Sequence, residues 1–81
     1  MSVVHRVTGY DKTSERLEQE WDVPHDLLRD IRALAHVPPQ DQEAAGAYPL
    51  DPSVIRDVAR AMRVEMSVDR YDWFLEPFAE A

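Results

Sequence analysis

The sequence contains no cysteine, only two glycines and no long apolar run. Without cysteine the chain forms no disulfide bond and no thiolate metal site, so its stability has to come from packing or from a partner. Gly9 and Gly46 stand apart, which excludes a glycine-rich loop for phosphate. No segment approaches the roughly 20 apolar residues of a membrane span, and the first residues lack the pattern of a signal peptide. We therefore expect a cytoplasmic protein without a membrane partner.

Basic residues are also scarce. The 81 residues include 9 Lys and Arg against 16 Asp and Glu, which gives a formal net charge of −7. At long range this charge repels phosphate backbones, so we do not expect nucleic acid as a partner. The chain is long enough for one hydrophobic core, and its hydrophobic content of 44% is sufficient for that core. We expect a single domain over residues 1–81.

Charged and apolar residues alternate between Arg16 and Val23. This pattern predicts a β-strand with one wet face and one buried face. The positions expected to face the core are Leu17, Trp21 and Val23, and the acidic positions expected to face solvent are Glu18, Glu20 and Asp22. β-Branched and aromatic residues over 3–10 predict the preceding strand, which a polar turn joins to this one. Gly9 indicates a β-bulge or a close approach of the backbone to another group.

An amphipathic helix is predicted next. Apolar residues recur at helical spacing over residues 25–35, and Pro24 suits the first turn. Two prolines then end the helix, because each one disfavours helical backbone in the residue before it. Residues 38–50 are typical of a loop, and we expect its tail to dock on the domain through Tyr48 and Leu50.

The second helix has a clear start. Asp51 is expected as its N-cap and Pro52 as its first residue, and the helical pattern continues to about Arg63. Alternating aromatic residues then predict a strand over residues 70–76, which Pro77 closes. The order strand, strand, helix, helix, strand predicts an α+β fold (ββααβ): a three-stranded, mainly antiparallel sheet with both helices packed on one face.

No residue pattern carries a catalytic or metal-binding signature. The histidines (His5, His25 and His36) lack the close spacing of metal ligands, so we expect no metal and no cofactor. The acidic residues of the alternating strand are spaced like the carboxylates of an inverting glycosidase, but a strand that faces water cannot raise the pKa of one of them. We expect no catalytic residue. An enzyme would need a carboxyl group with a raised pKa in a concave pocket.

The last strand predicts a second acidic row. If the odd-numbered residues from Tyr71 to Leu75 face the helices, the even-numbered residues lie together on the opposite face, with Phe74 between two acids. An exposed aromatic residue between acids is typical of a surface that binds a basic protein. The predicted partner-binding residues are Glu18, Glu20, Asp22, Asp72, Phe74 and Glu76. Alternatively, a terminal segment or a second copy of the chain covers Phe74 or Phe78.

Several segments occur together. They are a valine-rich first strand that ends in Gly9-Tyr10-Asp11-Lys12, an acidic returning strand, Val23-Pro24 before a helix, Tyr48-Pro49-Leu50 before a second helix, and the closing Tyr71-Asp72-Trp73-Phe74-Leu75. This combination, which covers nearly the whole chain, resembles a family of small uncharacterised bacterial proteins. They are similar to the small acidic immunity proteins that accompany polymorphic and contact-dependent toxins. The resemblance implies a cytoplasmic binding and neutralising role, and no site residue is carried over from it.

These observations favour a non-catalytic protein-binding module. Its acidic, aromatic face is expected to dock on a basic partner protein such as a bacterial toxin and to occlude it, as an immunity-type inhibitor does. The alternative is a structural or regulatory homo-oligomer, such as a homodimer, in which an exposed strand edge and the aromatic residues meet a second copy.

Overall fold

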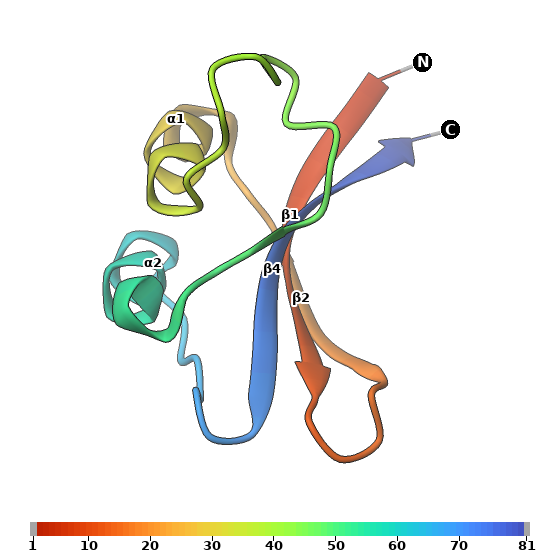
Figure 1. Cartoon of the computed structure of the whole chain (residues 1–81), viewed down its shortest axis with the longest axis vertical. Helices are drawn as coiled ribbons and strands as arrows, with labels where there is room; N and C mark the ends of the chain where they lie inside the picture. Colours follow the sequence, from red (N-terminus) through yellow and green to blue (C-terminus); the bar gives the residue numbers. More distant parts are fainter. Residues whose placement is uncertain (1, 81) are drawn as a thin grey trace.

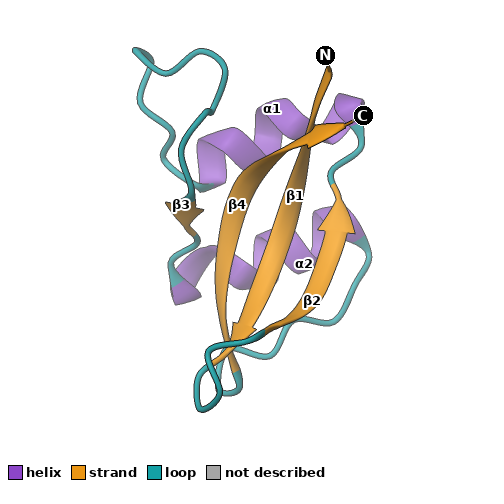
Figure 2. Ribbon diagram, turned by 90° about the vertical axis from the view of Figure 1, so that its right-hand side faces the viewer, coloured by secondary structure: helices purple, strands orange, loops and turns teal. Residues whose placement is uncertain are grey.

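The computed structural model describes residues 2–80. Its elements are, in chain order, β1 (Ser2–Asp11), β2 (Leu17–Asp22), α1 (His25–Leu34), β3 (Tyr48–Pro49), a 3-10 turn η1 (Pro52–Val54), α2 (Ile55–Met62) and β4 (Tyr71–Glu80). The strands form one antiparallel sheet in the order β2-β1-β4-β3. Figure 1 shows both helices on the same side of this sheet, and Figure 2 shows β1 and β4 at its centre. The fold is therefore α+β, with an antiparallel sheet and two helices.

The sheet has four strands, whereas the sequence predicted three. The additional strand, β3, lies within the predicted loop 38–50, and its two residues pair with the edge of β4. The amide of Leu50 then donates a hydrogen bond to the carbonyl of Trp73 (2.8 Å). Two residues are too few to show an alternation, which is why the pattern did not reveal this strand. The expected docking is confirmed, because Leu50 is buried and Tyr48 is half-buried.

The turn between β1 and β2 is held by Asp11. Its carboxylate accepts hydrogen bonds from the amides of Thr13 (2.8 Å) and Ser14 (2.9 Å). These two amide contacts hold the pKa of the Asp11 carboxyl below its ordinary value. The predicted polar turn is therefore built on an aspartate that satisfies the backbone of the residues after it.

A β-bulge interrupts the pairing of β2 with β1. Gly9 pairs with Gln19 but Tyr10 pairs with Leu17, so Glu18 is an extra residue in β2. Because side chains alternate along a strand, one extra residue reverses the faces on either side of it. Leu17 consequently shares the face of Tyr10, away from the helices, and is 40% exposed. The prediction that Leu17 faces the core is wrong for this reason.

The core lies between the sheet and the two helices. The indole of Trp73 stacks on that of Trp21, with ring centroids 5.5 Å apart, and its Nε1 donates to the carbonyl of Ser67 (2.9 Å). Gly9 lies against the same indole, so this glycine provides the predicted close approach. The buried apolar residues around Trp73 are Val7, Val23, Ile31, Ala35, Leu50, Ile55, Val58, Tyr71 and Leu75.

Strand β4 continues beyond Pro77, where the sequence predicted its end. Pro77 pairs with His5, and the ladder with β1 runs on to Glu80. The carbonyl of Trp73 points away from β1, because it accepts from the amide of Leu50. Backbone groups alternate in direction along a strand, so those of Pro77, an even number of residues after Trp73, also point away from β1. Pro77 has no N–H group to donate, and its nitrogen faces the edge of β4 beyond β3. Within residues 2–80 no strand pairs at that point, so no ladder hydrogen bond is lost.

The helices begin and end with identifiable contacts. Asp51 caps η1, as predicted, by accepting from the amide of Ser53 (2.9 Å), and this contact lowers the pKa of the Asp51 carboxyl. After each helix, the next two amides donate back to carbonyls of its last turn at 2.9–3.3 Å. His36 follows α1 and Arg63 follows α2 with positive φ angles of 57° and 58°. Glycine usually fills such positions, so both residues hold a backbone conformation that costs free energy.

Asp41 organises the loop between α1 and β3. Its carboxylate accepts from the hydroxyl of Tyr48 and from the amide of Ala45 (2.9 Å), and the hydroxyl contact contributes most to the lowered pKa of Asp41. The Nε2 atom of His5 lies 3.1 Å from the carbonyl oxygen of Glu43 and 3.2 Å from that of Ala44. The loop is thus attached to the sheet through Tyr48 of β3 and through His5 of β1.

Candidate binding face of the sheet

The candidate site is the face of the sheet that points away from α1 and α2. No helix of residues 2–80 covers this face, as Figure 1 shows. We call it the outer face. Strand register and side-chain contacts assign it the residues Val4, Arg6, Thr8, Tyr10, Leu17, Glu20, Asp22, Asp72, Phe74, Glu76, Phe78 and Glu80.

The structure brings five of the predicted partner-binding residues together on the outer face. They are Glu20, Asp22, Asp72, Phe74 and Glu76. The side chains of Asp22, Asp72 and Glu20 are 64%, 62% and 47% exposed, so their carboxylates are available to a partner. Phe74 and Glu76 are half-buried. The face therefore combines exposed carboxylates with an aromatic ring that is only partly covered.

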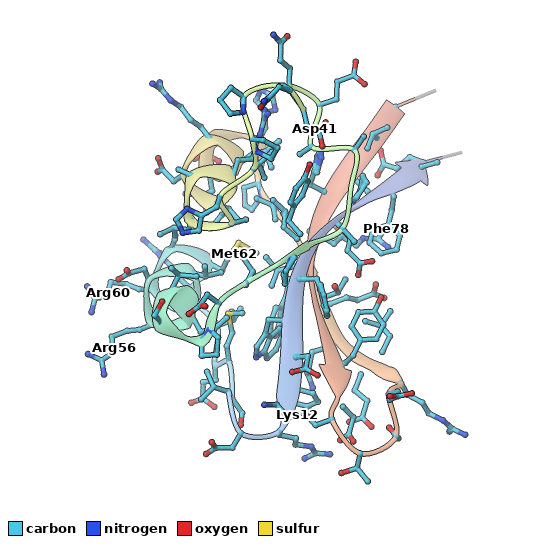
Figure 3. All side chains as sticks on the ribbon, in the orientation of Figure 1. Lys12, Asp41, Arg56, Arg60, Met62 and Phe78 are labelled. Carbon is cyan, nitrogen blue, oxygen red and sulfur yellow. The ribbon has the colours of Figure 1, made fainter. Side chains whose placement is uncertain are left out.

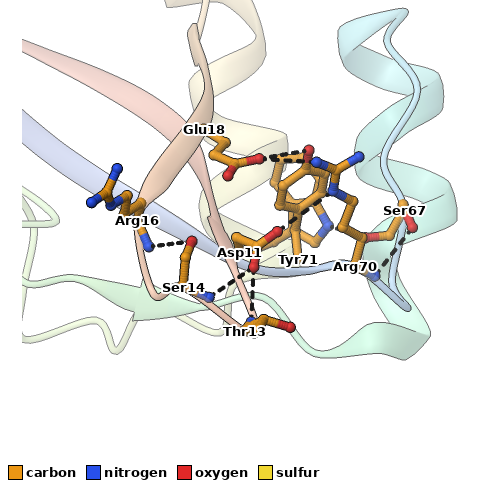
Figure 4. Close-up of polar contacts among 9 residues, drawn as sticks. Asp11, Thr13, Ser14, Arg16, Glu18, Ser67, Arg70 and Tyr71 are labelled. Carbon is orange, nitrogen blue, oxygen red and sulfur yellow. Dashed lines mark hydrogen bonds and ion pairs between the residues drawn. The ribbon is translucent and has the colours of Figure 1, made fainter.

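Glu18, the sixth predicted residue, lies elsewhere because it is the bulged residue of β2. Its Oε1 atom accepts from the hydroxyl of Tyr71 (3.3 Å) and from the guanidinium of Arg70 (3.3 Å). Arg70 also lies 3.5 Å from Asp11, so this cluster joins the β1–β2 turn to the start of β4 (Figure 4). Glu18 thus stabilises the end of the sheet at the β1–β2 turn and does not belong to the outer acidic row.

Arg6 lies among the acidic residues of the outer face. Its Nε atom is 2.7 Å from Asp22 and its NH1 atom is 3.6 Å from Glu20. Its guanidinium carbon is also 4.9 Å from the ring centroid of Phe78. Arg6 lies between the carboxylates of Glu20 and Asp22 and the ring of Phe78. The expected row of free acidic residues on β2 is therefore partly neutralised.

A hydrogen-bonded group occupies the centre of the outer face. Thr8 is completely buried, and its hydroxyl donates to Glu76. The hydroxyl of Tyr10 donates to the same carboxylate (2.8 Å), and this contact contributes most to the raised pKa of Tyr10. The ring of Tyr10 meets that of Phe74 edge to face, with centroids 5.6 Å apart. Glu76 is thus held by its neighbours and fixes the position of both rings.

A shallow hollow of about 320 Å³ opens beside these rings. Its walls include Tyr10, Phe74 and Ala47, and acidic residues from both central strands and from the turn surround it, Asp72 and Glu15 among them. A second hollow of about 260 Å³ adjoins it at the edge of β4 and shares Asp72 and Phe74. The outer face is therefore not flat, and its concave part is both aromatic and acidic.

The sequence left open whether Phe78 is exposed and did not assign Arg6, Thr8 and Tyr10 to this face. The pattern that identified β4 was present in β1 as well, where Val7 and Gly9 face the helices and the even-numbered residues face outward. Aligning the alternation of β1 with that of β4 across the sheet would have placed these residues beside the acidic residues. The exact partners depend on the register, which the sequence does not specify.

Three kinds of feature are absent from the described residues. Within residues 2–80 no three His, Asp or Glu side chains lie close enough together to hold a metal ion. No side-chain polar atom of this part of the chain is buried without a hydrogen-bond partner. None of its helices is both long and apolar enough to cross a membrane.

Comparison with known proteins gives one match. The model of a protein family described as a domain of unknown function (DUF7683) matches residues 4–76. These residues include both helices and most of the sheet. Neither the curated proteins nor the solved structures contain a match to the chain.

Proposed function

The chain belongs to the DUF7683 family of domains of unknown function, and we propose that it is a non-catalytic binding module whose outer face docks on a basic partner protein. The observation that carries this proposal is the uncovered outer face itself. Phe74 and Phe78 are partly exposed there, next to carboxylates that point into solvent. Partly exposed aromatic residues inside a charged rim are typical of the anchors of protein interfaces.

Charge distribution favours a basic partner. Apart from Arg6, and from Lys12 beside Asp72 at its edge, the charged side chains of the outer face are acidic (Glu20, Asp22, Asp72, Glu76 and Glu80). Arginines are instead concentrated in the helix layer, where Arg56 and Arg60 point away from the sheet (Figure 3). The negative potential is therefore on the sheet side of the molecule. Such an asymmetry orients a basic partner during the encounter and speeds association.

The free edge of β2 argues against pairing between two copies. β2 is bonded to β1 on one side only. An antiparallel pair made by two copies of this strand would bring acidic residues of one copy opposite those of the other, because Glu18, Glu20 and Asp22 account for half of its length. Like charges opposite each other destabilise a strand pair. We therefore favour a different, basic chain over a homodimer formed at this edge.

A toxin whose basic surface serves its own substrate is the specific partner that the resemblance to immunity proteins suggests. In that version the module neutralises the toxin by covering its positively charged surface. The general proposal does not depend on this choice. It requires only a partner whose docking surface is basic.

Capture of the partner with two matched variants of the full chain tests the proposal. The outer-face variant is Glu20→Gln with Asp72→Asn. The control variant is Asp30→Asn with Glu65→Gln, which removes the same two types of acid from α1 and from the segment after α2. Both variants change the net charge equally, so a difference between them reports position and not charge alone.

The expected result is a basic protein that wild type and the control variant retain from the native lysate and that the outer-face variant loses. High salt should release it. A protein that all three baits retain equally, or one that both variants lose equally, contradicts docking on the outer face. Thermal unfolding of the three proteins checks that their folds are equally stable.

A further inference from the structure

We propose that the hollow between Tyr10 and Phe74 receives an arginine side chain of the partner. The inference rests on the function proposed above and names the group that the outer face recognises. It is drawn from the way in which this molecule holds two arginines of its own.

The first of these is Arg6. Its guanidinium carbon is 4.9 Å from the ring centroid of Phe78, and its nitrogen atoms are 2.7 Å from Asp22 and 3.6 Å from Glu20. One aromatic ring and two carboxylates therefore hold this guanidinium, and they do so on the outer face itself. The combination suits a guanidinium, which is flat, stacks on rings and donates hydrogen bonds in its own plane.

The second is Arg70, at the start of β4. Its guanidinium carbon is 5.2 Å from the ring centroid of Tyr71, and its nitrogen atoms are 3.3 Å from Glu18 and 3.5 Å from Asp11. The set of groups is again one ring and two carboxylates. The two arginines come from different elements, so the arrangement has been built twice in one small domain.

The hollow holds a third such set without an arginine. The rings of Tyr10 and Phe74 form its wall, and Asp72 and Glu15 are the carboxylates at its rim that neither Arg6 nor Arg70 contacts. Among residues 2–80 the only cation in an ion pair with Asp72 is Lys12, whose Nζ lies 3.7 Å away. The Lys12 side chain is 45% exposed, so this surface pair is weak and an arginine can displace it from Asp72.

An incoming arginine would complete this third set. Glu76 accepts the hydroxyls of Thr8 and Tyr10 on one carboxylate oxygen, Oε2, so it holds the Tyr10 ring, and its negative charge adds to that of the rim. The hollow, of about 320 Å³, is open to solvent. An arginine on the surface of a partner can therefore enter it while the rest of the partner covers the neighbouring acidic residues.

Titration of the labelled full chain with a short peptide, followed by NMR, tests this site. The probe is acetyl-Gly-Arg-Gly-amide, and the comparison is the same peptide with citrulline, which keeps the shape of arginine but lacks its charge. We expect the arginine peptide to shift the ring resonances of Tyr10 and Phe74 and the amide of Asp72. The citrulline peptide should leave them in place.

Two variants and one control locate the binding. Glu15→Gln with Asp72→Asn should weaken the arginine peptide by about twofold to thirtyfold, since each exposed ion pair contributes about 0.2–1 kcal/mol. Phe74→Leu keeps an apolar side chain and removes the ring, so it should also weaken binding. Asp30→Asn with Glu65→Gln should have no effect. Thermal unfolding checks that each variant is folded.

Three results would overturn the proposal: equal shifts with the citrulline peptide, equal weakening in the rim variant and the control, or no shift at either ring. These results differ from a failure of the binding module. If the outer-face variant still loses its captured partner while the arginine peptide does not bind, the partner uses the outer face in another way. If the capture also fails to depend on that face, both proposals are wrong.

Discussion

Gly9 of β1 lies directly beneath the indole of Trp73 in β4. A Cβ atom placed on Gly9 would be 2.5 Å from Cζ3 of this ring, closer than two carbon atoms can approach. The two residues are paired across the sheet, so neither can move without disturbing the ladder between β1 and β4. The close approach lets the indole of Trp73 lie against β1 and stack on Trp21 of β2.

Gly9→Ala should therefore destabilise the protein. Forcing one extra carbon into a packed core costs about 1–3 kcal/mol, and the free energy of unfolding in urea should fall by this amount. Gly46→Ala is the matched control, because its Cβ would come no closer than 3.4 Å to Tyr48, which is ordinary contact. Equal stability of the two variants would show that the indole can move aside.

Replacing the left-handed residues after the helices should have the opposite effect. Arg63→Gly and His36→Gly relieve positive φ angles of 58° and 57°, and each should raise the free energy of unfolding by about 1 kcal/mol. Arg60→Gly lies inside α2 and should instead lower it by about 1 kcal/mol. A loss of stability in Arg63→Gly would mean that the arginine side chain makes a contact worth more than the backbone strain.

Thr8→Val tests the hydrogen bonds at the centre of the outer face. The substitution keeps the shape of this fully buried side chain but removes the donor to Glu76. We expect a loss of about 0.5–1.5 kcal/mol in the free energy of unfolding. The exposed Thr13→Val is the control and should leave stability nearly unchanged. If both behave alike, Tyr10 alone is sufficient to hold Glu76.

Acid should weaken the loop that Asp41 organises. The folded state lowers the pKa of this carboxyl, so its contribution to stability is present above the ordinary pKa of about 4 and is lost as the pH falls through the lowered value. Asp41→Asn should reduce stability at pH 7, and the difference from wild type should shrink below about pH 4. Thermal unfolding between pH 7 and pH 2 measures this difference. A gap that stays constant over that range would contradict the assigned role of the carboxylate.

The parts of the fold that could be predicted from sequence have a local cause. The cap at Asp51, the polar turn after β1 and the inward alternation of Tyr71, Trp73 and Leu75 depend on neighbouring residues only. Strand β3 could not be predicted, because two residues show no alternation and their pairing with β4 is a contact between distant segments. The continuation of β4 past Pro77 likewise depends on which edge its backbone faces.

The candidate site likewise combines features with a local cause and features that depend on contacts between strands. Alternation was sufficient to place Glu20 and Asp22 on one face, but the bulge at Glu18 arises from the register between β1 and β2. Arg6 came to lie between these acids because β1 pairs with β2 in that register. Contacts between distant strands therefore determine which of the predicted acidic residues remain free to bind.

The association rate of the captured partner with wild type, with Glu20→Gln plus Asp72→Asn, and with Asp30→Asn plus Glu65→Gln tests the central claim most directly. At low salt the outer-face variant should associate several-fold more slowly than the other two proteins, and the difference should diminish at high salt, because the steering charges lie on that face. Equal association rates of the two variants at low salt would contradict a docking site on the outer face.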